Sequence, residues 1–321
     1  MLAAGSSRVV PTQACLLQST AANAILQELD GLLARTRLTP YNTTRGYGFL
    51  KRVGIREGMR ADPAGGDRPA FMVTLVTAST GTRDEQAALR SVAAALAAGQ
   101  PDVRSVLQCI HTSANAAAPS ASEVVLHGNR EIHTRVRDLL FRVSADSFFQ
   151  VNTHQAVKLF DAVLAAAELR PSDTVLDLFC GTGAIALWVA HHCRSVLGVE
   201  VTEAAVADAR ANAHLNNIRN VTFRQGDLSK SVGGLGARPD VVIADPARAG
   251  LSAKLVRFLR MTAPRRIVYA SCNSQTLLRD LRLLCSAEGR GQAFTLRSLQ
   301  PVDMFPHTDH LEAIAVLTAD G

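Results

Sequence analysis

One thiol and two carboxylates stand at the ends of segments rich in β-forming residues. Cys272 follows the run Arg266–Ser271, Asp245 follows another such run, and Glu312 opens the last one. Open α/β sheets bind their ligands in the crevice outside the carboxyl ends of the strands. A nucleophile and two acids in such a crevice would suit covalent chemistry on a flat, electrophilic ring.

A glycine-rich turn lies upstream, at the end of the strand-like run Val175–Gly183. Gly181 lets the backbone approach a ligand closely, and the helix that follows offers free N–H groups at its start. Glu200 ends the next β-rich run, where a carboxylate can accept hydrogen bonds from both ribose hydroxyls. Asp227 follows the strand after that and suits an adenine amino group. The pattern predicts a cofactor that contains a nucleoside.

Two classes of cofactor fit this loop. Gly181–Ala186 matches the relaxed dinucleotide fingerprint GxGxxA, so a nicotinamide-dependent oxidoreductase stays open. Asp177, two residues before Phe179, favours S-adenosylmethionine instead. That ligand has no pyrophosphate, and its charged amino-acid end needs acids and backbone carbonyls nearby.

These residues need a sheet to bring them together, and the second half of the chain predicts one. From Gln155 onward apolar strands alternate with helices, which indicates a parallel sheet covered on both faces. The last two strands have no helix between them, so we expect an antiparallel pair. The expected fold class is α/β, with the Rossmann-like seven-stranded sheet of class I S-adenosylmethionine-dependent methyltransferases. The expected strands are 174–178, 195–199, 221–225, 241–244, 267–270, 294–302 and 311–317, with helices at 155–169, 184–191 and 202–217.

The first half has a different texture, a mixture of helices and strands without regular alternation. We therefore expect an N-terminal α+β substrate domain over 1–143 and the catalytic domain over 144–321. The expected helices are 20–35 and 84–98; the expected strands are 47–56, 70–78 and 103–112, with short ones around Val124, Ile132 and Phe141, and loops at 62–67 and 114–122.

Bulk properties narrow the class of protein. The 321 residues carry a net charge of +6, which suits a polyanionic partner such as nucleic acid. No apolar run of about 18 residues is present, so we expect no membrane span. The 6 cysteines are scattered without a CxxC pair, which predicts an intracellular protein, cytoplasmic first, with mitochondrial or nuclear placement open. We expect a monomer and no metal, and explain His191–Cys193 and His307–His310 by helix-end polarity and a turn.

Five motifs together resemble those of the RNA uracil-5 methyltransferases. They are Phe148–Asn152, Asp177–Gly183, Asp245–Gly250, Ser271–Asn273 and Phe305–Glu312, in the family's order and spacing. The resemblance implies that S-adenosylmethionine is the cofactor, that Cys272 is the nucleophile and that Glu312 is the general base. It also implies that Gln150, Phe179, Glu200 and Asp245 lie at the cofactor site. Ala247 and Ser274 depart from prolines that are common in the family.

The implied reaction explains why these residue types are needed. C5 of uracil is a poor carbon nucleophile, and a thiolate that adds to C6 turns C4–C5 into an enolate that can take a methyl group. A base must then remove the C5 proton so that the thiolate can leave. We expect the Cys272 pKa to be lowered by the following turn or helix and nearby arginine, and the Glu312 pKa to be raised. Arg248 could meet a phosphate of the RNA or shape the pocket.

Three functions remain in competition. The first is formation of 5-methyluridine in RNA, with the T-loop uridine of tRNA as the favoured target and rRNA as the alternative. The second is the nicotinamide-dependent oxidoreductase, in which Cys272 has no role. The third is a non-catalytic RNA-binding module that retains the family's fold.

Overall fold

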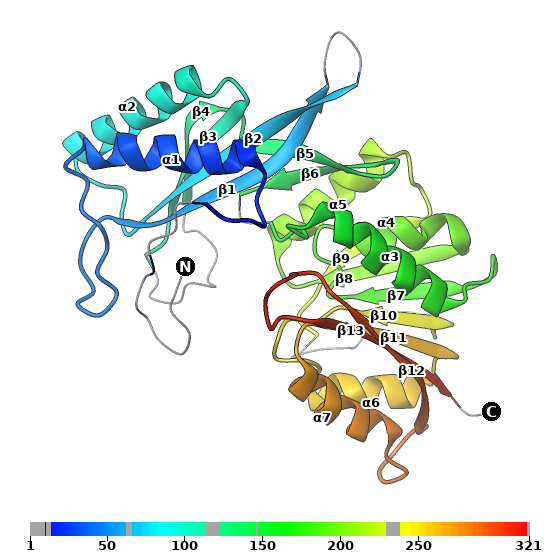
Figure 1. The fold of residues 1–321 in the computed structure, drawn as a ribbon. Coiled ribbons are helices and arrows are strands. Elements are labelled where there is room, and N and C mark those ends of the chain that lie inside the picture. The colour runs from blue at the N-terminus through cyan, green and yellow to red at the C-terminus, as the bar shows by residue number, and fades with distance from the viewer. Residues whose placement is uncertain are drawn as a thin grey trace. The chain divides into compact units, whose positions relative to one another are not determined.

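The structure, a computed structural model, describes residue 10 and residues 14–61, 66–112, 122–145, 147–228 and 238–319. The chain divides into two compact units, which Figure 1 shows as a ribbon. The first comprises Met1–Thr134 and Ser144–Asp146, and the second comprises Arg135–Val143 and Ser147–Gly321. The domain boundary at residue 143 and the role of the first domain in RNA binding stay predictions.

A six-stranded sheet with the order β4-β3-β2-β1-β5-β6 organises the first half of the chain. Two helices pack on one face of it, and Phe71, Val73 and Leu75 of β2 are fully buried beneath them. Ser19 caps α1, and Thr82 and Glu85 form a capping box at the start of α2. The elements are α1 (Thr20–Ala34), β1 (Leu50–Ala61), β2 (Asp67–Thr77), α2 (Arg83–Gly99), β3 (Val103–Ile110), β4 (Ser122–Gly128), β5 (Glu131–Val136) and β6 (Leu139–Ser144).

A seven-stranded sheet with the order β12-β13-β11-β10-β7-β8-β9 forms the second unit. Strand β13 runs in the direction opposite to the other six strands. Helices α3, α4 and α5 cover one face, and α6 and α7 cover the other (Figure 1). The predicted seven-stranded α/β fold is confirmed. The elements are α3 (Thr153–Ala167), β7 (Thr174–Leu178), α4 (Ala184–Val189), β8 (Ser195–Glu200), α5 (Glu203–Leu215), β9 (Val221–Gln225), β10 (Val241–Ala244), α6 (Ala253–Thr262), β11 (Arg266–Ser271), α7 (Ser274–Cys285), β12 (Phe294–Val302) and β13 (Glu312–Ala319).

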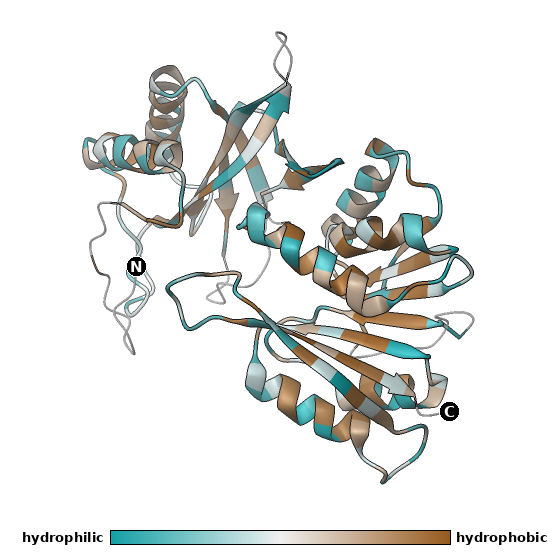
Figure 2. Ribbon diagram, turned by 45° about the vertical axis from the view of Figure 1, so that its right-hand side comes forward, coloured by the Kyte–Doolittle hydropathy of each residue, from teal (hydrophilic) through white to brown (hydrophobic). Residues whose placement is uncertain are grey.

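The central strands owe their position to uninterrupted apolar sequence. All four residues of β10 are buried, and so are the last four of β7 and the last five of β11. Figure 2 shows these strands in brown between their covering helices. A strand that is covered on both faces needs such a run, because neither face meets water.

Several expected boundaries shift. The strand expected from Tyr47 begins at Leu50, since Asn42 and Tyr47 close a turn through an isolated bridge. The helix expected to reach His191 ends at Val189 and continues as a 3-10 turn over Ala190–His192. The loops expected at 62–67 and 114–122 lie largely outside the described residues. Within the described ranges, the helices are too short or too polar to cross a bilayer.

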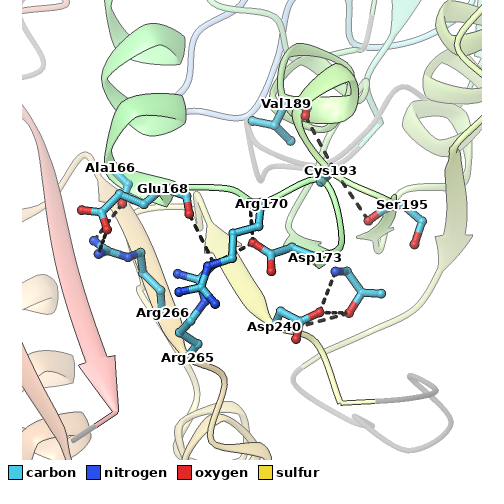
Figure 3. Close-up of polar contacts among 11 residues, drawn as sticks. Ala166, Glu168, Arg170, Asp173, Val189, Cys193, Ser195, Asp240, Arg265 and Arg266 are labelled. Carbon is cyan, nitrogen blue, oxygen red and sulfur yellow. Dashed lines mark hydrogen bonds and ion pairs between the residues drawn. The ribbon is translucent and has the colours of Figure 1, made fainter.

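Polar contacts tie the N-terminal ends of three parallel strands to the end of α3 (Figure 3). Arg265 donates to Asp173 Oδ2 at 2.6 Å and to the Glu168 carbonyl at 3.3 Å, and Arg266 pairs with the Glu168 carboxylate. Asp240, which precedes β10, accepts hydrogen bonds from the Thr174 amide and hydroxyl at 2.7 and 2.8 Å. These contacts hold the amino ends of the parallel strands together, whereas the predicted site residues on these strands lie at their carboxyl ends.

Candidate active site

The strand order places the predicted residues in one row along the carboxyl-end edge of the seven-stranded sheet. Glu312 opens β13, and the remaining positions follow the ends of the parallel strands. In spatial order the row is Glu312 (β13), Cys272 (β11), Asp245 (β10), Phe179 (β7), Glu200 (β8) and Asp227 (β9). Neighbouring strands lie about 4.8 Å apart, so Cys272 and Asp227 stand about 19 Å apart along the row. The predicted catalytic residues therefore occupy one end and the predicted adenosine contacts the other.

Cys272 sits in a tight turn between β11 and α7. The hydroxyl of Ser271 donates to the Asn273 carbonyl at 3.1 Å and accepts from the Asn273 amide at 3.2 Å. Asn273 also caps α7, because its side chain accepts a hydrogen bond from the Gln275 amide at 3.0 Å. The residues on both sides of the thiol are thus anchored, and Cys272 itself remains partly exposed.

Helix α7 also holds the loop that follows Asp245. The side chains of Asn273 and Thr276 both donate to the Arg248 carbonyl, at 3.0 and 3.1 Å. Asp280 is fully buried and accepts hydrogen bonds from the Leu251 amide at 2.7 Å and the Tyr269 hydroxyl at 2.8 Å. One helix therefore positions both the thiol and the backbone of Arg248.

Glycine is required where this loop passes Asp280. Gly250 has a φ of +72°, and a Cβ built there would lie 2.4 Å from Asp280 Oδ2. A larger residue would meet both an unfavourable backbone conformation and a steric clash.

Antiparallel pairing brings Glu312 beside Cys272. The ladder between β11 and β13 runs from Arg266 opposite Thr318 to Ser271 opposite Ala313. One step further along the same register, Cys272 faces Glu312. Directly opposed residues of an antiparallel pair have Cα atoms about 5 Å apart. The predicted nucleophile and base are therefore neighbours. Only 7% of the Glu312 surface is exposed.

The charges around the thiol disfavour its ionised form. Burial raises the pKa of Cys272 above its ordinary 9.0, and the carboxylates of Glu312 and Asp245 raise it further. A backbone amide of the turn and Arg248 act in the opposite direction but do not reverse the shift. The expectation of a lowered pKa is wrong, because two acids and burial outweigh one exposed arginine.

Both carboxyl groups of this cluster hold their protons more tightly than usual. Burial raises the pKa of Glu312, as expected for a group that takes up a proton near neutral pH. Burial and the nearby Glu312 raise the pKa of Asp245 to about 7. The structure thus brings Cys272, Asp245, Glu312 and Arg248 into one electrostatic cluster.

The glycine loop that follows β7 belongs to the half of the row where the cofactor is predicted to bind. Phe179 has a φ of 63°, a left-handed conformation that is uncommon for a large side chain and is found at functional sites. Gly181 also has a positive φ, and a Cβ built on it would meet no atom within 4 Å. The Glu200 carboxylate accepts from the Gly181 amide at 3.2 Å and from the Thr202 amide at 2.9 Å. The loop therefore leaves space where a ligand could approach its backbone.

Asp177 adds a feature that the sequence only hints at. The side chain is 1% exposed, and among the described residues neither carboxylate oxygen has a hydrogen-bond partner. Burial raises its pKa well above the ordinary value and the charges of Asp245 and Glu200 add to the shift, although the nearby backbone amide of Ala186 lowers it. A buried carboxyl group without partners is costly unless a ligand supplies them. Its position two residues before Phe179 is the sequence signal that could have identified Asp177 as a site residue.

Gln150 lies in the segment that leads into α3, and 9% of its surface is exposed. Asn152 caps this helix and donates to the Met304 carbonyl at 3.2 Å, which links the segment to the loop before β13. Phe149 packs against Phe141 with ring centroids 5.1 Å apart, so it serves the core. Phe148 is 69% exposed and remains available to a ligand.

Comparison with known proteins gives the family. A family model described as tRNA (uracil-5-)-methyltransferase matches residues 121–229 and 238–320, which is more than half of the chain. The chain belongs to this family.

Curated relatives match along nearly the whole chain. An uncharacterized RNA methyltransferase of Chlorobaculum tepidum is 35% identical over 96% of this chain and 62% of its own length. A second, of Bacillus cereus, is 33% identical over 98% of this chain and 66% of its own length. The chain thus spans less than two thirds of the length of these curated relatives.

A solved structure of the same family shares the fold. The tRNA (uracil-54, C5)-methyltransferase of Pyrococcus abyssi, in complex with S-adenosyl-L-homocysteine, superposes with a TM-score of 0.74 at 26% identity, covering 97% of this chain and 70% of that one. The second unit therefore has the fold of S-adenosylmethionine-dependent methyltransferases.

Two departures from the family's motifs are accommodated locally. Ala247, in place of a common proline, accepts a hydrogen bond from the Gly250 amide at 2.9 Å through its carbonyl, which either residue can supply. Ser274 is the first residue of α7, a position that favours proline but does not require it. Neither substitution removes a group that touches the thiol.

Proposed function

We propose that the protein methylates C5 of a uridine in RNA, with S-adenosylmethionine as methyl donor. The observation that carries the proposal is the register that sets Cys272 beside Glu312, on the same sheet edge as the open glycine loop. Family membership supports the same reading. The whole protein's substrate is part of the proposal, since the chain spans only part of its relatives' length.

The residues present fit the proposed cofactor. Asp177 is a buried carboxyl group without a partner among the described residues, and Gly181 leaves its surroundings open. We assign Gln150, Phe179, Gly181, Glu200, Asp227 and Asp245 to the cofactor, with Glu200 toward the ribose hydroxyls and Asp227 toward the adenine. S-adenosylmethionine, when bound, supplies an electrophilic methyl group that C5 of the activated uracil takes up.

The residues of the chain carry the remaining steps. The Cys272 thiolate adds to C6, forming a C–S bond, and the electron pair of the C5–C6 bond moves toward C5 and O4. After C5 has gained its methyl group, Glu312 accepts the C5 proton. The electron pair left at C5 reforms the double bond, the C–S bond breaks and Cys272 leaves as a thiolate. The buried Glu312 suits this role because its raised pKa strengthens it as a base.

We further propose tRNA as the substrate and its T-loop uridine as the target, with rRNA as the alternative. The net charge of +6 favours a polyanion in either case. The target base must leave its stack to reach the sheet edge. The 69% exposed ring of Phe148 is one surface on which it can stack.

The test is release of tritium from C5-labelled uridine in an unmodified tRNA transcript and in an rRNA fragment, each with S-adenosylmethionine. We expect release from tRNA by the wild type and by Cys285→Ala, a control at another partly buried cysteine, and none by Cys272→Ala. Release from the rRNA fragment alone would move the target to rRNA. A wild type that binds S-adenosylmethionine but releases no tritium from either RNA would contradict the proposal and favour a non-catalytic RNA-binding module.

A further inference from the structure

Helix α5 carries a polar stripe on the side that faces the protein. Asp208 and Asn212 of α5 and Asn216, its C-cap residue, follow one another at intervals of four residues, so they lie on one side of the helix. Asp208 is 2% exposed and Asn212 is fully buried. Buried carboxylate and amide groups are costly unless each finds partners, so their hydrogen bonds show what the stripe does.

The two asparagines pair with the backbone of β6 as a neighbouring strand would. Asn216 accepts from the Leu140 amide at 2.8 Å and donates to the Leu140 carbonyl at 2.7 Å, and Asn212 accepts from the Arg142 amide at 2.8 Å. Four residues of helix rise about 6.0 Å and two residues of strand rise about 6.7 Å, so the two repeats match. Among the described strands β6 is the last of its sheet, so the stripe supplies hydrogen-bond partners to an edge beside which none of those strands lies.

The same stripe reaches both parts of the proposed cofactor site. Asn212 donates to the Thr182 carbonyl at 3.0 Å, in the middle of the glycine loop. Asp208 accepts from Arg142 Nε at 3.1 Å and from the Ser147 hydroxyl, three residues before Gln150. Both Thr182 and Ser147 are buried, at 2% and 3% exposure. The glycine loop and the segment that carries Gln150 are therefore hydrogen-bonded to the same helix face, four residues apart.

We propose that Asp208 and Asn212 are positioning residues that hold the Gln150 segment and the glycine loop in the relative placement that cofactor binding needs. The inference rests on the proposed function, since it takes the site to bind S-adenosylmethionine. An apolar stripe could pack α5 equally well, but it would not fix Thr182, β6 and Ser147 to one another by directional contacts. Neither residue touches the cofactor; each acts through the backbone or side chain that it holds.

Asn212→Asp tests the link selectively. A carboxylate at this position still accepts from the Arg142 amide, but it can no longer donate to the Thr182 carbonyl and opposes it with a negative charge. The probe is S-adenosylhomocysteine, titrated by isothermal calorimetry against the purified full chain, with the melting temperature of each variant measured alongside. We expect Asn212→Asp to weaken binding about tenfold, the effect of losing one buried hydrogen bond and gaining a repulsion. In steady-state assays the KM for S-adenosylmethionine should rise and the KM for RNA should stay unchanged.

Asn220→Ala is the matched control. Its side chain donates to the carbonyls of Ala190 at 2.7 Å and Cys193 at 3.3 Å. These contacts lie near the amino ends of β8 and β9, whereas the glycine loop follows the carboxyl end of β7. We expect it to lower the melting temperature and to leave the affinity for S-adenosylhomocysteine within twofold. Ser147→Ala, which removes only one hydroxyl, covers the case in which Asn212→Asp does not fold, and it too should weaken binding.

The outcomes separate this inference from the proposed function. If the wild type binds S-adenosylhomocysteine and Asn212→Asp and Ser147→Ala bind it as tightly, the positioning role is refuted while the proposed function stands. If Asn220→Ala weakens binding as much as Asn212→Asp, the effect is general destabilisation, and the role is refuted as well. A wild type that does not bind the probe overturns both proposals.

Discussion

Replacing Asp245 by asparagine should make the Cys272 thiol react faster with iodoacetamide at neutral pH. Burial and the carboxylates of Glu312 and Asp245 hold the thiol pKa above 9.0. At pH 7.5 the thiolate is therefore less than about 3% of the total, and the alkylation rate should rise about tenfold per pH unit. Removing a neighbouring negative charge favours the thiolate, lowers the pKa and raises the rate.

The size of the effect follows from the sheet geometry. Asp245 and Cys272 lie on adjacent strands and are offset by two residues, which places them about 8 Å apart. Two unit charges at that distance interact by about 2 kcal/mol at an effective dielectric constant of 20. We halve this to about 1 kcal/mol because the thiol is partly exposed, and expect a rate gain of about fivefold at pH 7.5. The gain should fade below pH 7, where Asp245 becomes protonated in the wild type.

The assay is the rate of carbamidomethylation at the peptide that contains Cys272, followed by mass spectrometry between pH 6.5 and 10. Asp240→Asn is the matched control, because Asp240 and Asp245 flank the same strand at opposite ends. That variant should leave the rate at Cys272 unchanged. The reasoning would be refuted if the alkylation rate of wild-type Cys272 stopped rising with pH below pH 8.5, or if Cys272 were alkylated more slowly in Asp245→Asn than in the wild type.

Of three further predictions, two concern the same cluster and one concerns the buried Asp280 that supports it. Glu312→Gln should let the adduct between Cys272 and RNA accumulate, seen as a denaturation-resistant band on a gel; turnover without such a band would exclude Glu312 as the base. Since folding raises the Asp245 pKa from 3.8 to about 7, the folded state binds the extra proton and loses stability as pH rises from about 4 to 7, by at most about 4 kcal/mol. In urea titrations Asp245→Asn should flatten this dependence, and an unchanged slope would contradict it. Tyr269→Phe removes a buried 2.8 Å hydrogen bond to the Asp280 carboxylate and should destabilise the protein by about 2 kcal/mol; a loss below about 0.5 kcal/mol would mean that the bond contributes little.

The central strands of the second unit could be predicted because burial on both faces leaves an unbroken apolar run. Val241–Ala244 has the predicted bounds and is buried throughout, whereas Val221–Gln225, which also has the predicted bounds, alternates buried with more exposed residues. Helices α6 and α7 were not assigned from the sequence, although their buried apolar residues recur three to four residues apart, at Leu255 and Leu259 and at Leu277, Leu281 and Leu284. This helical spacing is a signal that the sequence contains.

The candidate site, too, could be predicted from the sequence only in part. Cys272, Asp245 and Glu312 are recognisable because each stands where a β-rich run begins or ends. The direction of the Cys272 pKa shift was predicted wrongly, because burial, its largest cause, and the approach of Glu312 from a strand forty residues later both depend on the folded chain. The buried, unpartnered carboxyl group of Asp177 likewise depends on what surrounds it in three dimensions.

The place of β13 has a consequence for the order in which the site is assembled. It lies between β11 and β12, although it is the last described strand, so β12 can join the sheet only together with it. The β12–β13 hairpin must therefore dock as a unit against a sheet that already ends at Cys272. During synthesis Cys272 therefore emerges before Glu312, and docking of a single hairpin brings the proposed base to the proposed nucleophile.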